Sequence, residues 1–513
     1  MSTAARLISG TAASWVQIVV NMGSQVVLVP IYLLYWDTET YGVWLAVQGI
    51  MNTLSMLDLG HQNFLAYEFL RLGRGNRPAL SKYLWSGIVM GWIICLVQII
   101  LIAILILSGA LSFLLGDSGI ENTSLVESAA IALALQGFAW LLFASSPGLL
   151  GRALATFGYF PRAAWWTAVG VTMTALSPLV AVILGADLVL TSLVLVIGTG
   201  IYTLPIYFDF FKLLRKEKIG FVKPSMAIGY INFRKSLPLL GKSLFENIRQ
   251  QGVRLILTPL AGPVGLVAFS TMRTGANVAL QGLNTIVNPL LPDLMRFLHA
   301  RDQPRTESAF ATVWILVIAL MSPGVVILQA VVEPLYLLWT QNKVVFDPLL
   351  FAILSFGVLV YAVVQPAVAV VIGNNLTKVQ LALTTIAAFI VLVFLIISVP
   401  IIGIVGAGVA LLLAEIVAAV GYKKHAKRWL RQNNLQWPSQ AFHIALTALL
   451  IAAVSLGGMI LAPEFKWVII GISMPLFGWN FFRYWRVLPQ IAKDNARNIG
   501  MRIPGLRRIF RRF

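Results

Sequence analysis

Apolar runs long enough to cross a membrane recur along the whole chain, and short polar loops separate them. A spanning helix needs about 20 mainly apolar residues, and we count about fourteen such runs. Their approximate limits are 7–35, 41–70, 82–107, 126–149, 163–185, 188–212, 236–259, 264–297, 308–332, 347–372, 378–399, 402–422, 441–461 and 465–486. The pattern predicts an all-α, polytopic membrane protein with about 14 transmembrane helices.

The loops between these runs alternate in charge. One set carries most of the Lys and Arg, as in Arg71 to Lys82 and Lys212 to Lys235, and the other set carries mainly Asp and Glu. Basic loops stay in the cytoplasm under the positive-inside rule. We therefore expect an even number of spans in the cell inner membrane, with both termini cytoplasmic. The net charge of +19 then reflects orientation, and no nucleic-acid partner is predicted.

Composition and motifs argue against an enzyme. The chain is 59% hydrophobic and 11% charged, and no loop approaches the roughly 50 residues that a folded catalytic domain needs. Gly241-Lys242-Ser243 resembles the end of a phosphate-binding loop, but Ser236 replaces the required first glycine. The four histidines are scattered without metal-ligand spacing. We expect no cofactor. The energy for transport is expected to come from an ion gradient, the membrane potential or the substrate gradient.

Two similar bundles are predicted from short matches in the same order. Val27-Leu-Val-Pro30-Ile precedes Tyr41-Gly42, and Ile256-Leu-Thr-Pro259-Leu precedes Val264-Gly265. Parallel repeats of this kind form a site at their interface. The prediction is two pseudo-symmetric six-helix lobes around a central cavity, plus two extra C-terminal helices. Its segments are 1–213 and 236–422 for the lobes, 214–235 for a cytoplasmic linker, 423–486 for the extra helices and 487–513 for a basic tail.

The basic tail ends in Leu506-Arg-Arg-Ile-Phe-Arg-Arg-Phe513, whose apolar and basic residues fall on opposite helical faces. An amphipathic helix on the anionic cytoplasmic leaflet fits this pattern. A disordered basic tail that only reinforces orientation fits it equally, and both interpretations stay open.

Basic residues inside the predicted spans are candidates for substrate binding. They are Lys242, Arg249 and Arg254 in the seventh span and Arg273 in the eighth. A charge at mid-membrane costs at least a few kcal/mol, so these side chains are expected to face a wet or protein-lined interior. Arg suits phosphate because its rigid donor fork matches phosphate oxygens.

Acidic residues inside the spans are candidates for ion coupling. They are Asp58 in the second span, Glu246 in the seventh and Glu415 in the twelfth. Intramembrane carboxylates load and release H+, and Na+ is the alternative ion. Simpler interpretations remain open: Lys242 and Glu246 as an i,i+4 ion pair near the interface, and Asp58 and Glu415 as partners of nearby backbone groups.

The chain resembles bacterial polysaccharide flippases of the Wzx type in the MOP (multidrug/oligosaccharidyl-lipid/polysaccharide) exporter superfamily. The similar segments are Val29-Pro30-Ile31, Tyr41-Gly42-Val-Trp44, Leu57-Asp58-Leu-Gly60 and the Gly-rich stretch from Ile401 to Ala410. The resemblance implies two six-helix lobes that alternate between inward-open and outward-open states. The family's acidic residue in the second span matches Asp58, and its cationic cavity matches Arg249, Arg254 and Arg273.

The function implied by the resemblance is transfer of undecaprenyl-pyrophosphate-linked oligosaccharide from the cytoplasmic to the periplasmic leaflet. Implied partners are this lipid-linked substrate, membrane lipids, and a polysaccharide polymerase and glycosyltransferases. The alternatives are a MATE-like drug or cation antiporter, a lipid II flippase, and a membrane glycosyltransferase. Twelve spans are usual for the resembled group, and fourteen for lipid II flippases.

Overall fold

The computed structural model of the chain describes residues 3–116, 123–247 and 252–494, and these residues form helices and no strand. The division by contacts gives two compact units. Unit 1 comprises Met1–Ser270 with Trp339–Val344, and unit 2 comprises Thr271–Leu338 with Val345–Phe513. The last residues of the basic tail, including Leu506 to Phe513, lie outside the described part of the chain.

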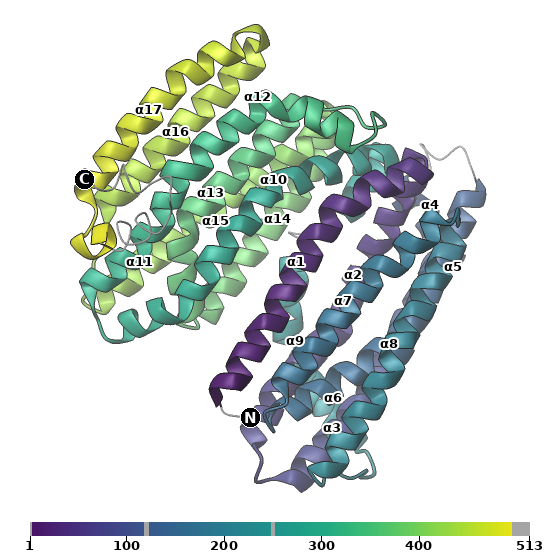
Figure 1. The fold of residues 1–513 in the computed structure, drawn as a ribbon. Coiled ribbons are helices and arrows are strands. Elements are labelled where there is room, and N and C mark those ends of the chain that lie inside the picture. Colours follow the sequence, from purple (N-terminus) through teal and green to yellow (C-terminus); the bar gives the residue numbers. More distant parts are fainter. Residues whose placement is uncertain (1–2, 117–122, 248–251, 495–513) are drawn as a thin grey trace. The chain divides into compact units, whose positions relative to one another are not determined.

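The elements that begin in unit 1 are α1 (Thr3–Tyr35), α2 (Thr38–Leu72), α3 (Arg77–Leu107), α4 (Ala110–Leu115), α5 (Thr123–Ala139), the π-helical turn η2 (Trp140–Ser145), α6 (Ser146–Ala155), α7 (Phe160–Ile183), α8 (Leu188–Lys216), α9 (Met226–Asn247) and α10 (Val253–His299) (Figure 1). The helix α10 continues into unit 2.

The elements of unit 2 that follow α10 are α11 (Gln303–Leu316), the π-helical turn η4 (Val317–Met321), α12 (Ser322–Trp339, whose last residue belongs to unit 1), α13 (Pro348–Gly373), α14 (Thr377–Ile402), α15 (Val405–Gln432), α16 (Ser439–Leu461), the short 3-10 turn η5 (Pro463–Phe465) and α17 (Lys466–Val487).

Twelve helical segments of the described chain are long and apolar enough to cross a membrane. Two further long helices, α2 with 35 residues and α9 with 22, are more polar and fall outside that set. Together these segments confirm the predicted all-α membrane protein of about fourteen spans. The two polar helices are the ones that carry Asp58 and the Lys242–Glu246 stretch.

Local sequence explains where several helices of unit 1 begin. The carboxylate of Asp37 accepts a hydrogen bond from the backbone N–H of Thr40, and that of Asp187 accepts one from Leu190, so each caps the first turn of its helix (α2 and α8). The loops before α2 and α8 are linked to each other: the indole N–H of Trp36 donates to the carbonyl of Ala186 at 2.9 Å.

Helix α9 packs along α2 and α3 in unit 1. A Cβ atom on Gly60 of α2 would lie 2.8 Å from the Cβ of Leu240, so only glycine permits this approach of α2 and α9. The sequence repeat assigns the same helix to the second lobe. The predicted division into six-helix lobes is thus not the division made by contacts, and it stays a prediction.

The segment between α8 and α9 is shorter than the predicted linker, because α9 begins at Met226. It lies on α3: the Lys82 ammonium donates to the carbonyl of Lys223 at 2.8 Å, and the Trp85 indole donates to that of Gly220 at 2.9 Å. Lys and Arg are good helix formers, so the charges near 234 do not end the helix.

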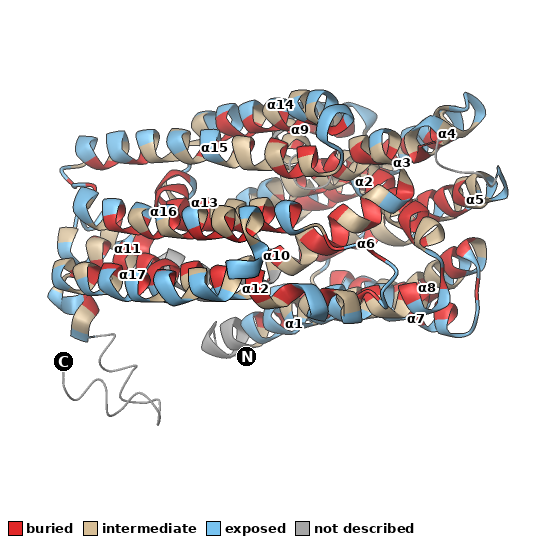
Figure 2. Ribbon diagram, turned by 90° about the horizontal axis from the view of Figure 1, so that it is seen from above, coloured by how far each residue is buried: buried red, intermediate tan, exposed pale blue. Residues whose placement is uncertain are grey.

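The core of unit 2 surrounds α13, most of whose residues are buried (Figure 2). Helix α16 packs on α13 and α11, and α17 packs on α16 and η4. The Asn480 side-chain amide donates to the carbonyl of Ile444 at 3.0 Å, and the Tyr484 hydroxyl donates to that of Ala311 at 3.2 Å. The two extra C-terminal helices are therefore part of the packed core of this unit.

Candidate functional site

Asp58, near the middle of α2, is a fully buried acidic residue of unit 1. Its Oδ2 accepts two hydrogen bonds, from Gln62 Nε2 at 2.7 Å and from Trp140 Nε1 at 3.1 Å. Gln62 follows by four residues and so lies on the same helical face. Burial of a carboxylate is costly unless hydrogen bonds compensate it, and these two bonds do so within an apolar helix bundle.

Arg152 of α6 completes the network from the other side of Gln62. Its Nη1 donates to Gln62 Oε1 at 2.7 Å and to the carbonyl of Gly148 at 3.1 Å, and its Nη2 donates to Asn63 Oδ1 at 2.9 Å. A guanidinium has only donors, so the amide of Gln62 must turn its oxygen to Arg152 and its nitrogen to Asp58. One neutral side chain therefore joins a buried anion to a cation.

Two glycines make room for this network. A Cβ on Gly148 would lie 2.2 Å from Gln62 Oε1. A Cβ on Gly91 of α3 would lie 2.9 Å from Ser145 Oγ and 3.4 Å from Asp58 Oδ1. The small residues at these two positions are therefore requirements of the polar site.

The π-helical turn η2 supplies the third element of the site, and it ends at Ser145, two residues before Pro147. Proline has no N–H, so the carbonyl of Phe143, one turn earlier, loses its helical partner. The Thr203 hydroxyl of α8 donates to that carbonyl at 3.5 Å. Such turns recur at functional sites, and this one presents Trp140 to the carboxylate of Asp58.

His61 lies beside the network on α2 and is fully buried. Neither ring nitrogen has a hydrogen-bond partner among the described residues. The ring meets Phe233 of α9 edge-on, with centroids 6.3 Å apart. His61 thus belongs to the α2–α9 contact and forms no part of the hydrogen-bonded chain.

Comparisons with known proteins give a fold and no sequence family. No protein-family model and no curated protein matches the chain. A solved structure of the lipid II flippase MurJ in an inward closed conformation is similar, with a TM-score of 0.66 and 14% identity over 93% of this chain and 99% of that one. An inward-facing multidrug resistance MATE family transporter of the MOP superfamily has a TM-score of 0.58 and 15% identity over 80% of this chain and 94% of that one.

The chain has a fold similar to that of these two membrane proteins. At identities of 14% and 15% the likeness establishes the fold alone. It agrees with the fold that the superfamily resemblance implies, while the resemblance to Wzx-type flippases stays a prediction.

In this fold, the predicted basic stretch of the seventh span divides between two helices. Lys242 and the half-buried Glu246 lie on α9, and Arg249 lies outside the described residues. Arg254 lies in the first turn of α10, within unit 1, and is half-buried. Among the described residues it forms no ion pair with a carboxylate, and the ionisable group that acts on it electrostatically is Tyr41 of α2.

The other predicted residues belong to unit 2. Arg273 follows Gly262 on α10, where a φ of 70° and a ψ of 174° interrupt the helix, and Glu415 lies on α15. Both side chains are half-buried. The predicted meeting of Arg254 and Arg273 in one lining remains a prediction.

Sequence reasoning missed Gln62, Trp140 and Arg152 as site residues. Arg152 falls between the predicted spans 126–149 and 163–185, yet it lies inside α6 and reaches α2. The available signal was the i,i+4 spacing of Asp58 and Gln62, which places an acid and an amide on one face.

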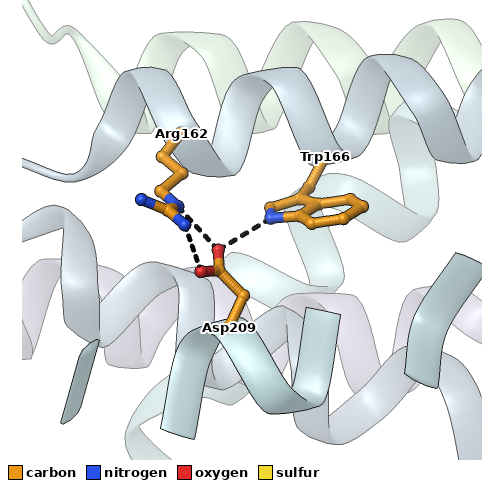
Figure 3. Close-up of polar contacts among 3 residues, drawn as sticks. All are labelled: Arg162, Trp166 and Asp209. Carbon is orange, nitrogen blue, oxygen red and sulfur yellow. Dashed lines mark hydrogen bonds and ion pairs between the residues drawn. The ribbon is translucent and has the colours of Figure 1, made fainter. Parts of the chain in front are cut away.

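A second polar cluster ties α7 to α8 near the predicted cytoplasmic surface (Figure 3). Arg162 Nε donates to Asp209 Oδ2 at 2.7 Å, its Nη2 pairs with the other carboxylate oxygen, and Trp166 Nε1 donates to Oδ2 at 2.9 Å. The Asp209 side chain is 9% exposed and that of Arg162 is 55% exposed. The cluster is a structural tether between two consecutive helices.

Proposed function

We propose that this protein is a flippase that carries undecaprenyl-pyrophosphate-linked oligosaccharide from the cytoplasmic to the periplasmic leaflet by alternating access. We place it in the inner membrane with both termini in the cytoplasm. Arg249, Arg254, Arg273 and Lys242 bind the pyrophosphate. Asp58, Glu246 or Glu415 couples turnover to an ion gradient. A polysaccharide polymerase and glycosyltransferases are its partners in the same route.

The observation that carries the proposal is the guanidinium of Arg254. It lies on a helix that is apolar enough to span a membrane, and among the described residues no carboxylate forms an ion pair with it, Tyr41 being its ionisable neighbour. An uncompensated charge within a bilayer is expensive, so it persists where a ligand of opposite charge uses it. The rigid fork of Arg suits phosphate oxygens better than the point charge of Lys.

Support for a lipid-linked substrate comes from the extent of the fold match. The match to the lipid II flippase MurJ covers 93% of this chain, whereas the match to the MATE transporter covers 80%. The same match makes lipid II flipping the second candidate function. A MATE-like exporter of cations is less favoured, because an unpaired Arg repels a cationic drug.

The proposal is tested by complementation in a strain that lacks the gene. We expect Arg254→Ala to reduce surface polysaccharide at least about tenfold while leaving the amount of membrane protein unchanged, since one charge-assisted contact to phosphate contributes about 1.5–3 kcal/mol. Arg254→Lys should retain part of the activity. Arg71→Ala is the control, because that side chain is 68% exposed.

Full complementation by both Arg254→Ala and Arg273→Ala would reject this substrate site. The second candidate is separated by asking whether the wild-type gene also rescues depletion of a lipid II flippase. Rescue there without an effect on surface polysaccharide would assign the protein to lipid II.

A further inference from the structure

The network around Asp58 connects a carboxylate to an arginine through a single amide. Gln62 Nε2 donates to Asp58 Oδ2 at 2.7 Å, and Gln62 Oε1 accepts from Arg152 Nη1 at 2.7 Å. With Asp58 ionised, the anion and the cation compensate each other across the amide. The charge state of one end therefore acts on the other end, within unit 1 alone.

The second oxygen of the carboxylate is the natural site for a proton. Both N–H donors reach Oδ2, whereas Oδ1 has no hydrogen-bond partner among the described residues and lies in the neighbourhood of the buried Ser145 hydroxyl. A cation such as Na+ needs several oxygen ligands, and the groups that reach Oδ2 are N–H donors instead. The geometry favours H+ over Na+ as the ion taken up here.

Among the residues that the structure describes, few other charges face this carboxylate. The ionisable groups described as acting on it are Arg152 of α6 and the Cys95 thiol of α3, and η2 contributes the neutral Trp140 and Ser145. On α2 itself, His61 turns to Phe233 of α9. Protonation of Asp58 would therefore leave Arg152 as the uncompensated charge of the network.

We infer that Arg152 is an additional anion-binding residue whose availability is set by the proton on Asp58, with Gln62 as the connecting residue. When Asp58 is ionised, Arg152 is held by Gln62, Asn63 and the carbonyl of Gly148. When Asp58 is neutral, the network carries a net positive charge and attracts a phosphate group. The anion class rests on the proposed function, whereas the link between the proton and the arginine rests on the contacts alone.

The sign of the coupling follows from this charge balance. Proton uptake should strengthen anion binding, and anion binding should favour proton uptake by the same factor. Coupling between two sites typically changes affinity about 5- to 150-fold, so we expect about tenfold here.

The test measures farnesyl pyrophosphate binding to the purified full-length protein in nanodiscs at pH 5.5 and pH 8.0. Asp58→Asn imitates the protonated state, and its affinity is compared with that of wild type at each pH. The ligand titrates equally in both measurements, so the ratio of the two affinities is independent of that titration. We expect a ratio near one at pH 5.5 and about tenfold weaker binding by wild type at pH 8.0. Arg152→Ala should bind more weakly at pH 5.5 and lose most of the pH dependence beyond that of the ligand.

Arg71→Ala is the matched control for loss of one positive charge, and it should keep the wild-type profile because its side chain is 68% exposed and paired with Glu68. A ratio of wild type to Asp58→Asn that does not change with pH would overturn the inference, as would a wild-type profile in Arg152→Ala. If Arg152→Ala does not fold, the Asp58→Asn ratio decides alone. A correct pH pattern in a protein that flips no lipid-linked saccharide would reject the proposed function and leave the switch in place.

Discussion

Among single side chains, Gln62 has the most consequential position. It is 1% exposed and hydrogen-bonds both Asp58 and Arg152. A buried polar group that loses its partner costs about 1–3 kcal/mol, and an ionised one costs more. The amide therefore stabilises two charged groups at once, and its removal affects both.

Replacing Gln62 with Leu is predicted to lower the free energy of unfolding by about 2–3 kcal/mol, because Asp58 and Arg152 each lose a charge-assisted hydrogen bond. Thermal unfolding in detergent measures the effect. Asn63→Ala is the control, since it removes only one acceptor of Arg152, and it should cost about 1 kcal/mol. Equal losses in the two variants would contradict the central role of the amide.

The tether between α7 and α8 gives a second prediction. Removing one partner of the Arg162–Asp209 ion pair should lower the stability more than removing the other. Asp209→Ala should cost about 1–2 kcal/mol, because it leaves both the Trp166 indole and Arg162 without their acceptor. Arg162→Ala should cost less than about 1 kcal/mol, because an exposed ion pair contributes little. Chemical or thermal unfolding of the two variants gives the order, and a larger loss for Arg162→Ala would be inconsistent with it.

Among the helices, the close approach of α2 and α9 depends on one missing side chain. Gly60→Ala would bring a Cβ within 2.8 Å of Leu240 Cβ, and overpacking of this kind costs about 1–3 kcal/mol. Gly478→Ala in α17 is the matched control, because no atom lies within 4 Å of its Cβ position. The thermal midpoint should fall for Gly60→Ala and stay level or rise for Gly478→Ala; the reverse order would exclude the contact.

The helices were predictable because lipid imposes a local rule: every spanning segment must be apolar for about 20 residues. The capping residues Asp37 and Asp187 also indicate where their helices begin. The start of α9 was not predictable from charge, since basic residues continue a helix readily. The partnership of Asp58 with Arg152 escaped prediction because it joins residues far apart in sequence through packing, which no local pattern encodes.

For the whole molecule, the alternation of basic and acidic loops predicts the orientation in the membrane. Phe221, between α8 and α9, is 73% exposed, and Val345, before α13, is 83% exposed. They are predicted to lie on the cytoplasmic and periplasmic sides, respectively. Both are suited to labelling because the native Cys95 is buried.

In a variant with Cys95 replaced by Ala, a cysteine at 345 should react with a membrane-impermeant maleimide in intact spheroplasts. A cysteine at 221 should react only after the membrane is opened. Labelling of both positions, or of 221 alone, in intact cells would contradict the predicted orientation.

The account as a whole depends on a membrane-embedded cationic site that receives a lipid pyrophosphate. The most direct test is transfer of fluorescent undecaprenyl-pyrophosphate oligosaccharide across proteoliposomes that contain the purified protein. We predict transfer well above that of empty liposomes, with a rate at least about tenfold lower for Arg254→Ala, as expected for loss of one charge-assisted contact. Equal rates for wild type, Arg254→Ala and empty liposomes would contradict the account.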